Sequence, residues 1–364
     1  MAAYTTIDDP EAHFQVKTYT GNSTDDTAIT LDGTNNLQPD MVWFKSRSAA
    51  INHVLVDSVR GVTKYLTSND TSGEATVSDA LKSFDSDGFT LDEDATTSSA
   101  FVNGTGKTYV TWCWKANGTG SSNTTGSINT TATSANTTSG FSIITYTGNG
   151  TSGATIGHGL GVAPTFIALK NRSMTGGAAE PWRVYHDKNT SAPATDYLAL
   201  NTTAATADDA NAWNDTAPSS TLITLGNGGA SNQNTETYVA YAFADVQGYS
   251  KFGNYIGNGN ADGAFVYTGF RPAWLMCKLP SDGTAHWRIF DNKRDGYNQT
   301  GKRVYANDTS VESDTDEGVD FLSNGFKWRV TAGEVNGTAS SGIIYAAFAE
   351  APFVNSNGVP CNAR

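Results

Sequence analysis

The sequence predicts an all-β protein made of three tandem β-sandwich-like repeat domains with turns rich in Gly, Asn and Thr. The first observation is composition, since short polar residues dominate the 364-residue chain and only 16% of residues are charged. The second is that 15 Tyr, 16 Phe and 8 Trp supply the bulky apolar side chains. Polar turn residues mixed with aromatic and β-branched residues are typical of strands joined by short turns. The third observation is that one order of motifs occurs three times.

Each copy opens on a strand that leads into a Gly-Asn turn, and it continues through a proline to an apolar strand that ends in lysine. In the middle copy these positions are Tyr146, Gly148, Pro164 and Lys170. The outer copies carry the same residues at Tyr19, Gly21, Pro39 and Lys45, and at Tyr255, Gly257, Pro272 and Lys278. A second apolar strand follows within 53–57, 182–186 and 287–291, and an aromatic-rich closing strand within 109–116, 238–244 and 343–349. Proline before a strand and glycine at a turn meet requirements of the backbone, so the copies are expected to share one backbone path.

The repeat length of roughly one hundred residues suits an independently folded domain and is too long for one turn of a solenoid. The expected organisation is a docking arm at 1–13, a first repeat at 14–116, a low-complexity linker at 117–140, a second repeat at 141–245, a third repeat at 246–350 and an extended tail at 351–364. The linker alternatively holds one strand at 127–131. The connector at 246–250 is so short that the second and third repeats are expected to touch at a fixed angle.

Within the repeats, three stretches carry local predictions. Residues 77–84 are the only stretch with helical character, and they are long enough for a single turn. Asp-Gly at 87–88 and Asn-Gly at 324–325 stand between apolar runs and predict tight hairpins.

Charge excludes several classes of partner. The formal net charge is −13, and no cluster of Lys or Arg is present that would neutralise a row of phosphates. Nucleic-acid binding and attachment to an anionic membrane are therefore disfavoured. No stretch approaches the length of a transmembrane helix, and no signal peptide is recognisable, so we expect synthesis in the cytoplasm without classical export and no membrane insertion.

No residue is assigned a catalytic, cofactor-binding or metal-binding role. The glycine-rich stretch 157–161 lacks the following helix and the Gly-Lys-Ser/Thr of a phosphate loop, so a loop at a strand end is the better interpretation. His186 stands where the other copies have Asp57 and Asp291, which points to a hydrogen-bonded strand terminus and not to catalysis. The acidic clusters at 92–94 and 314–317 lack the spacing of a calcium loop, and the three cysteines lack that of a zinc site.

Aromatic residues divide into a recurrent and a non-recurrent set. Trp114, Phe243 and Phe348 fall at the same position of the closing strands, which predicts that they are equivalent and buried. Trp213 and Trp328 recur less clearly and are the candidates for a ligand surface. Loops around 174–181 and 291–301, the latter carrying Arg294 and Tyr297, differ most between copies and are expected to face outward as surface-binding elements.

Several stretches together resemble a known family. They are the start MAAYTTIDDP, the segments VDSVRGVTKYL and FDSDGF, the closers YVTWCWKA and YVAYAFA, the central GFSIITYTGNGTSGATIGHGLGVAPTFIALKNR, and FLSNGFK followed by IYAAFAEAPF near the end. In these stretches the chain resembles tail-fibre-like virion structural proteins of marine bacteriophages, which carry a repeated domain of unknown function. The resemblance covers essentially the whole chain and brings no catalytic motif with it.

What the resemblance implies is a non-enzymatic virion protein, a tail fibre or tail-associated adhesin that attaches to the particle and contacts the host surface. The implied partners are other virion proteins of tail or capsid, a host surface glycan or protein, and further copies of the chain in a homo-oligomer, since phage fibres are often trimers. One alternative is a capsid decoration or head-fibre protein. A second alternative is a depolymerase of surface polysaccharide.

Overall fold

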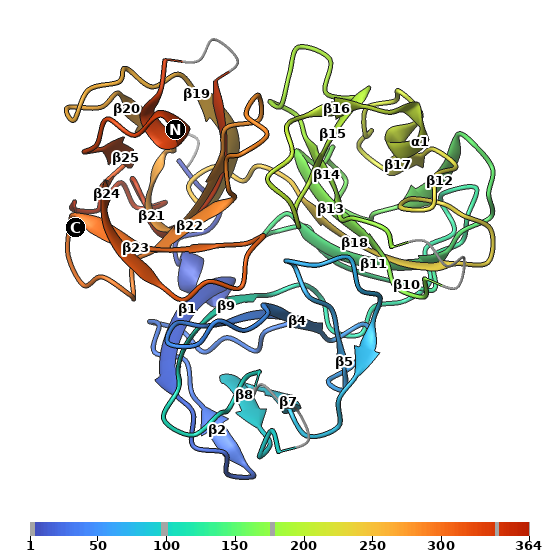
Figure 1. The fold of residues 1–364 in the computed structure, drawn as a ribbon, viewed down its shortest axis with the longest axis horizontal. Coiled ribbons are helices and arrows are strands. Elements are labelled where there is room, and N and C mark those ends of the chain that lie inside the picture. The colour runs from blue at the N-terminus through green and yellow to red at the C-terminus, as the bar shows by residue number, and fades with distance from the viewer. Residues whose placement is uncertain (1–3, 96–100, 175–178, 339–341, 364) are drawn as a thin grey trace.

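The computed structural model describes residues 4–95, 101–174, 179–338 and 342–363. Figure 1 shows three lobes of β-structure arranged around a common centre. The described α-helices, α1 (Ala210–Trp213) and α2 (Gly333–Asn336), have four residues each. The prediction of an all-β protein is therefore confirmed. We call the lobes the first unit (residues 14–116), the second unit (117–245) and the third unit (246–352).

The first unit has a four-stranded sheet in the order β1-β9-β3-β4, and a smaller sheet in the order β2-β8-β7 lies against it. A one-turn 3-10 helix, η1 (Pro10–Ala12), precedes it, capped by the side chain of Asp9. Its strands are β1 (Phe14–Thr20), β2 (Thr27–Ile29), β3 (Met41–Ser46), β4 (Val54–Asp57), β5 (Lys64–Tyr65), β6 (Ala75–Thr76), β7 (Leu81–Asp85), β8 (Gly88–Leu91) and β9 (Thr108–Trp114). The hairpin expected at Asp87-Gly88 joins β7 to β8. Residues 81–84 belong to β7, so the helical expectation for 77–84 is wrong: Leu81 is buried in the sheet interior, which outweighs the local propensity.

The second unit adds strands at both ends of the same four-stranded arrangement, giving the order β10-β11-β18-β13-β14-β15-β16, with β12 and β17 as a separate pair. Its strands are β10 (Ala132–Asn136), β11 (Phe141–Thr147), β12 (Ala154–Gly157), β13 (Phe166–Asn171), β14 (Arg183–His186), β15 (Asp196–Ala199), β16 (Ala207–Asp208), β17 (Leu222–Leu225) and β18 (Thr237–Phe243). Residues 117–140, expected to be a linker, contain β10, which pairs along β11. Ile128 of the same segment is 7% exposed, so this stretch belongs to the fold of the second unit.

In the third unit one continuous sheet of eight strands runs in the order β19-β26-β21-β22-β23-β24-β25-β20. Its strands are β19 (Ser250–Tyr255), β20 (Phe265–Tyr267), β21 (Phe270–Lys278), β22 (Arg288–Asp291), β23 (Thr300–Tyr305), β24 (Ser313–Leu322), β25 (Gly325–Trp328) and β26 (Ile343–Pro352). The hairpin predicted at Asn324-Gly325 joins β24 to β25. Because β19 and β20 are the two ends of this sheet, each presents one edge that no other described strand covers.

The three units share strand order and register. In each, the opening strand pairs with the closing strand, which also pairs with the apolar strand after the proline. Trp114 pairs with Met41, Phe243 with Phe166, and Phe348 with Trp274. The prediction that Trp114, Phe243 and Phe348 are equivalent and buried is confirmed, since their exposed fractions are 2%, 6% and 2%.

The central strands are buried on both faces because each main sheet lies between two cores. In β13, Phe166 and Ala168 point to a core shared by all three units, whereas Ile167 and Leu169 point to the core of the second unit alone. Alternate residues of β3 and β21 divide in the same way. Side chains alternate between the faces of a strand, so a continuous apolar run is what a doubly covered sheet requires.

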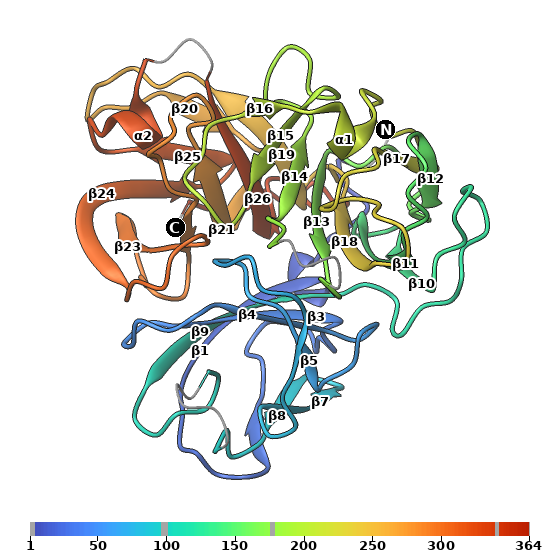
Figure 2. The ribbon, with the colours of Figure 1, turned by 45° about the vertical axis from the view of Figure 1, so that its right-hand side comes forward.

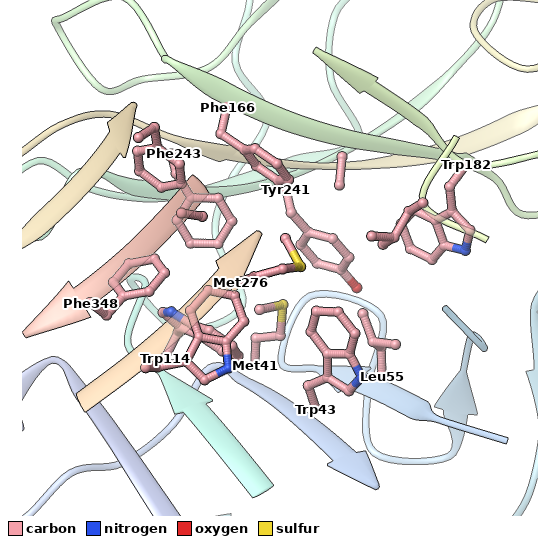
Figure 3. Close-up of a pocket in the computed structure, with 15 residues that line it drawn as sticks. Met41, Trp43, Leu55, Trp114, Phe166, Trp182, Tyr241, Phe243, Met276 and Phe348 are labelled. Carbon is pink, nitrogen blue, oxygen red and sulfur yellow. The ribbon is translucent and has the colours of Figure 1, made fainter. Parts of the chain in front are cut away.

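At the centre of the molecule the closing strands of the three units meet. The Phe348 ring lies 5.6 Å, centroid to centroid, from both Trp114 and Phe243, and the last two are 6.3 Å apart. Figure 3 shows these aromatic side chains converging with Met41 and Met276 on a small cavity. The units therefore pack against one another through a common core.

Hydrogen bonds from three buried lysines also join each unit to its neighbour. The lysine that ends each apolar strand is buried and donates to a backbone carbonyl of the neighbouring unit: Lys45 to Thr309 at 2.8 Å, Lys170 to Thr71 at 2.9 Å and Lys278 to Thr203 at 2.9 Å. Burial lowers the pKa of each of these lysines to about 8. The first unit reaches the third, the second reaches the first, and the third reaches the second, so the three contacts form a cycle.

The arm before the first unit is also packed, and it lies on the third unit. Ile7 is 3% exposed in the shared core, and the Thr5 hydroxyl donates to the carbonyl of Gln247 at 2.7 Å. The tail is tied to the arm by the Asp8 carboxylate, which accepts from the backbone amide of Ser356 at 2.6 Å. The described part of the predicted docking arm is therefore held against the body of the molecule.

Candidate functional site

The structure places three of the four predicted surface-binding residues in the interior. Trp213 is 1% exposed, on α1 against the Tyr185 ring, and Trp328 is fully buried with its indole N–H donating to the Tyr255 hydroxyl at 2.6 Å. Arg294 is 4% exposed, and its Nε donates to Asp291 Oδ2 at 2.6 Å. These three assignments are corrected, because each side chain fills an interior or interface position. Tyr297, 84% exposed, does lie at the surface.

The strand termini at Asp57, His186 and Asp291 are structural, as predicted. Asp57 Oδ1 accepts from the backbone amide of Arg60 at 2.8 Å, and Asp291 Oδ1 accepts from that of Arg294 at 3.0 Å. The His186 ring is held between two backbone groups, with Nε2 at 3.1 Å from the Tyr345 carbonyl and Nδ1 accepting from the Lys188 amide at 3.1 Å. Such an imidazole has no free nitrogen for proton transfer to a substrate.

The glycine-rich loop and the first acidic cluster also serve the fold. His158, in the loop after β12, is buried, and its Nδ1 accepts from the backbone amide of Leu160 at 3.2 Å. Asp94 is 3% exposed, and its Oδ2 accepts from the amides of Val102 and Asn103 at 2.9 and 3.0 Å. Both groups are committed to neighbouring backbone, which is how buried polar groups are ordinarily satisfied.

The central cavity is too small to be a site for a drug-sized ligand. Its volume is about 40 Å³, and aromatic, Met, Leu and Ala side chains of all three units line it (Figure 3). Ligand pockets commonly have volumes of ~300–1,000 Å³. The cavity is a packing defect where three sheets meet.

A surface groove of suitable size lies between the two ends of the open sheet of the third unit, where that unit borders the second. It consists of two adjoining hollows of about 380 and 360 Å³, which share Asp245, Lys251 and Tyr267. One wall is β19 and the opposite wall is β20, both visible in the third unit in Figures 1 and 2. We call it the β19–β20 groove.

Two aromatic side chains of β20 remain exposed beside this groove. Phe265 and Tyr267 are 47% and 50% exposed, while Val266 between them is buried in the core of the third unit. The arm contributes a third ring, because the Tyr4 hydroxyl donates to the Gly269 carbonyl at 2.9 Å and lies 2.8 Å from the Tyr267 hydroxyl. With its hydrogen committed to Gly269, Tyr4 accepts the hydrogen of Tyr267, which leaves the Tyr267 oxygen as an acceptor.

Charged side chains of both signs complete the groove. Asp245 Oδ1 accepts from the backbone amide of Phe252 at 2.8 Å, and the same carboxylate borders both hollows. Burial raises the pKa of Asp245, and the charge of Lys251 offsets part of that rise. At the far end the Lys188 ammonium pairs with Asp187 at 2.6 Å. The groove thus offers an acceptor, Asp245, and a donor, Lys251, that both line its two hollows together with aromatic side chains.

Sequence reasoning missed these residues, although a signal was available. In matching strands of the other units, β2 and β12, the position of Phe265 is held by Ala28 and Thr155, because these strands pair in the same register with β8 and β17 as β20 does with β25. The position of Tyr267 corresponds to Gly157 of β12 and to Thr30, the residue that follows β2. Core positions recur between units, so two bulky aromatics at outward positions of one copy alone indicate a surface specific to that copy.

The described part of the chain contains neither a metal-binding cluster nor a membrane-spanning helix. Over those residues, no three or more His, Cys, Asp or Glu side chains gather in a way that could hold a metal ion. None of the described helices has the length and apolar character needed to cross a membrane.

Comparison with known proteins assigns a family but no activity. No curated protein and no solved structure matches the chain. A family model described as a domain of unknown function, DUF7483, matches residues 9–352, a span that includes all three units and every residue of the groove named above except Tyr4. The chain therefore belongs to the DUF7483 family.

Proposed function

We propose that this chain is a structural component of a bacteriophage virion, a tail fibre or tail-associated adhesin that attaches to the particle and contacts the host surface. The observation that carries the proposal is the β19–β20 groove, where Phe265 and Tyr267 are exposed at positions that the other two units fill with small residues. Exposed aromatics at a groove are a feature of recognition surfaces. The resemblance to tail-fibre-like virion proteins points the same way.

The architecture suits a rigid structural component of a particle. The three units share a core, and buried lysines tie each unit to the backbone of the next. A net charge of −13 favours solubility and discourages nonspecific association. These properties support a structural role.

We further propose that the first unit faces the particle and the third faces the host, since the groove lies on the third. Deleting residues 1–13 would be a poor test of this polarity, because it removes Ile7 from the shared core and Tyr4 from the groove. Antibodies against surface loops of single units leave the fold intact and are the better probe.

The decisive experiment is immunogold labelling of intact phage particles with antibodies raised against the full chain. Label on the tail, with antibodies to third-unit loops also blocking adsorption to host cells, is the expected result. Label on the head would replace the tail assignment by a capsid decoration or head fibre. Particles without any label would overturn the proposal.

A further inference from the structure

The β19–β20 groove contains exposed aromatic residues that the fold does not require, as a binding site would. The three units provide an internal comparison, because the same strand position is built three times. Ala28 and Thr155 show that the fold tolerates a small residue where the third unit has Phe265. An aromatic that is 47% exposed at such a position contributes little to the core, so its presence requires another explanation.

The backbone beside the groove is open in the third unit and closed in the second. In the second unit β10 covers the outer edge of β11, where Ala132 pairs with Thr145. The equivalent position in the third unit is Asn254 on β19, and no described strand lies outside it. The edge near Asn254 therefore presents backbone donors and acceptors toward the groove.

An extended peptide does not fit this edge. A strand added to β19 would need the outward groups of Ser250 and Phe252, the next two outward positions. Ser250 already exchanges backbone hydrogen bonds with Val246, at 2.9 and 3.2 Å, and the Phe252 amide is bound by Asp245 at 2.8 Å. Only a short stretch of edge is open, so recognition must come from side chains and a few backbone groups.

The side chains present suit a sugar. Hexose rings combine an apolar face, which stacks on aromatic rings, with neighbouring hydroxyls that both donate and accept hydrogen bonds. Phe265 and Tyr267 supply the rings, and Asp245 and Lys251, which line both hollows, supply an acceptor and a donor. Tyrosine is well matched to this task because it combines an apolar body with a polar tip.

Charge decides between neutral and acidic sugars. The whole chain carries a net charge of −13, and the carboxylate of Asp245 stands in the middle of the groove. The nearby Lys188 is already paired with Asp187, so it contributes little net positive charge. A polyanionic glycan would meet an acidic protein and a groove with balanced charges, which is unfavourable for association.

From these observations we infer that the β19–β20 groove binds a neutral oligosaccharide, with Phe265 and Tyr267 as stacking residues and Asp245 and Lys251 as hydroxyl ligands. The inference deepens the proposed contact with the host surface, and it rests on that proposal only for the claim that the glycan comes from the host. Sugar binding itself is inferred from the residues of the groove.

The test is calorimetric titration of the full chain with short neutral oligosaccharides of glucose, galactose, mannose and N-acetylglucosamine, with oligogalacturonate as the acidic counterpart. Saturable binding of at least one neutral member is expected, without binding of oligogalacturonate. Phe265→Ala and Tyr267→Thr, which restore the residues of the first unit, should each weaken binding by about tenfold. Tyr297→Ala removes an exposed ring outside the groove and should leave affinity unchanged.

Phe265→Ala protects the test against a folding artefact, because Tyr267→Thr also removes the hydrogen bond to Tyr4. Equal melting temperatures of wild type and variants establish that the fold is intact. The inference is overturned if no neutral member binds, if both substitutions leave affinity unchanged, or if only oligogalacturonate binds. Tail labelling without sugar binding would refute this inference alone, whereas sugar binding by a protein absent from particles would refute the proposed function alone.

Discussion

The interface between the first and second units and that between the second and third are built on the same backbone contact with different side chains. The Glu74 amide donates to the carbonyl of Arg172 at 2.8 Å, and at the other interface the Thr206 amide donates to that of Pro280, also at 2.8 Å. Glu74 further accepts two hydrogen bonds from the Arg172 guanidinium, at 2.8 and 2.9 Å. Thr206 instead donates from its hydroxyl to Asn189 at 2.8 Å. The matched position therefore carries an ion pair at the first–second interface, which we call the ionic interface, and an uncharged side chain at the second–third interface, which we call the neutral interface.

The difference continues toward the centre of the molecule. At the first–second interface the Tyr241 hydroxyl donates to Asp57 at 2.7 Å. At the second–third interface the matching residues are Ala346 and His186, and the histidine contacts the Tyr345 backbone. The interface of the first and third units follows the ionic pattern, with Arg47 bound to Glu312.

The comparison teaches that the charges are replaceable while the backbone contact and the apolar core are kept. A buried ion pair often contributes little compared with a neutral replacement, because both charges must leave water. Removing one partner is a different matter, since it leaves a buried charge uncompensated. The predictions below separate these effects at matched positions.

The largest contrast in stability is expected between Arg60→Ala and Asn189→Ala. These substitutions truncate the side chains at matching positions beside the ionic and the neutral interface. Arg60 has a fully buried side chain bound to Asp57 and, at 3.3 Å, to Glu74. Its loss should cost about 3–5 kcal/mol of the free energy of unfolding, since the buried Asp57 loses its counter-charge while Glu74 keeps only Arg172. Loss of the neutral Asn189 contact should cost about 1 kcal/mol. Urea unfolding of the full chain measures both.

The control for charge alone is Arg329→Ala, which breaks surface pairs with Asp320 and Asp262 in which the arginine side chain is 38% exposed. A surface pair contributes ~0–1 kcal/mol, so this variant should be nearly neutral. If Arg60→Ala were no more costly than Asn189→Ala, the ionic interface would have no energetic distinction from the neutral one.

A truncation at the centre should weaken the packing of the second unit against both of the other units. Phe243 contacts the rings of Trp114 and Phe348 from the other units, and it is 6% exposed. Phe243→Ala is expected to cost about 3–5 kcal/mol, because a large buried side chain leaves a cavity among packed rings. The measurement is again the free energy of unfolding, with Tyr297→Ala as the aromatic control at an exposed site. If Phe243→Ala lowered the free energy of unfolding no more than Tyr297→Ala does, Phe243 would lie outside the cooperative core.

Acid should affect the neutral interface through His186. Burial lowers the pKa of His186 to about 4, against ~6.5 in the unfolded chain. Between these values the unfolded chain binds more protons, so stability rises with pH across this window and is lost on acidification. The loss attributable to this group approaches about 3 kcal/mol. The structural reason is that Nδ1 accepts from the Lys188 amide, and protonation would set two donors against each other.

Carboxylates also titrate in acid, so the readout is the difference between wild type and His186→Gln. The free energy of unfolding of the wild type should fall more steeply between pH 6.5 and 4 than that of the variant. Parallel curves would mean that His186 carries no proton linkage.

Much of this architecture was accessible from the sequence because each copy repeats the positions that its own sheet requires. The closing-strand aromatics, the strand-ending lysines and the Gly-based hairpins were all predictable on that basis. Continuous apolar runs such as 166–169 also carried the signal of a sheet covered on both faces. The missing information was which surface of each unit meets the next.

The contacts that close the ring join residues that are far apart in the chain, and no local pattern links them. Arg47 and Glu312 lie in different units, and their pairing depends on how three sheets pack. Trp213, Trp328 and Arg294 looked like surface residues when judged by lack of recurrence, although all three are buried. Trp213 and Trp328 lie in the cores of the second and third units, and Arg294 binds Asp291 of its own unit. The groove was not predicted because it lies between β19 and β20, the two ends of one sheet, and the strand order of that sheet cannot be derived from local sequence patterns.

The smallest effect is expected from filling the central cavity at the neutral interface. Ala346 lines this cavity of about 40 Å³ and stands at the closing-strand position that Trp112 and Tyr241 occupy in the other units. Those large side chains reach across their interfaces to Asp291 and Asp57, whereas alanine leaves space unfilled. Ala346→Val adds two methyl groups where a void exists. Cavity volume costs ~24 cal/mol per Å³, so the free energy of unfolding is expected to rise by about 1 kcal/mol.

The matched control is Ala347→Val, because Ala347 points into the separate, filled core of the third unit, where added volume should destabilise the fold. Thermal unfolding measures both, and a loss of stability for Ala346→Val as large as that for Ala347→Val would mean that the neutral interface is already as tightly packed as the ionic ones.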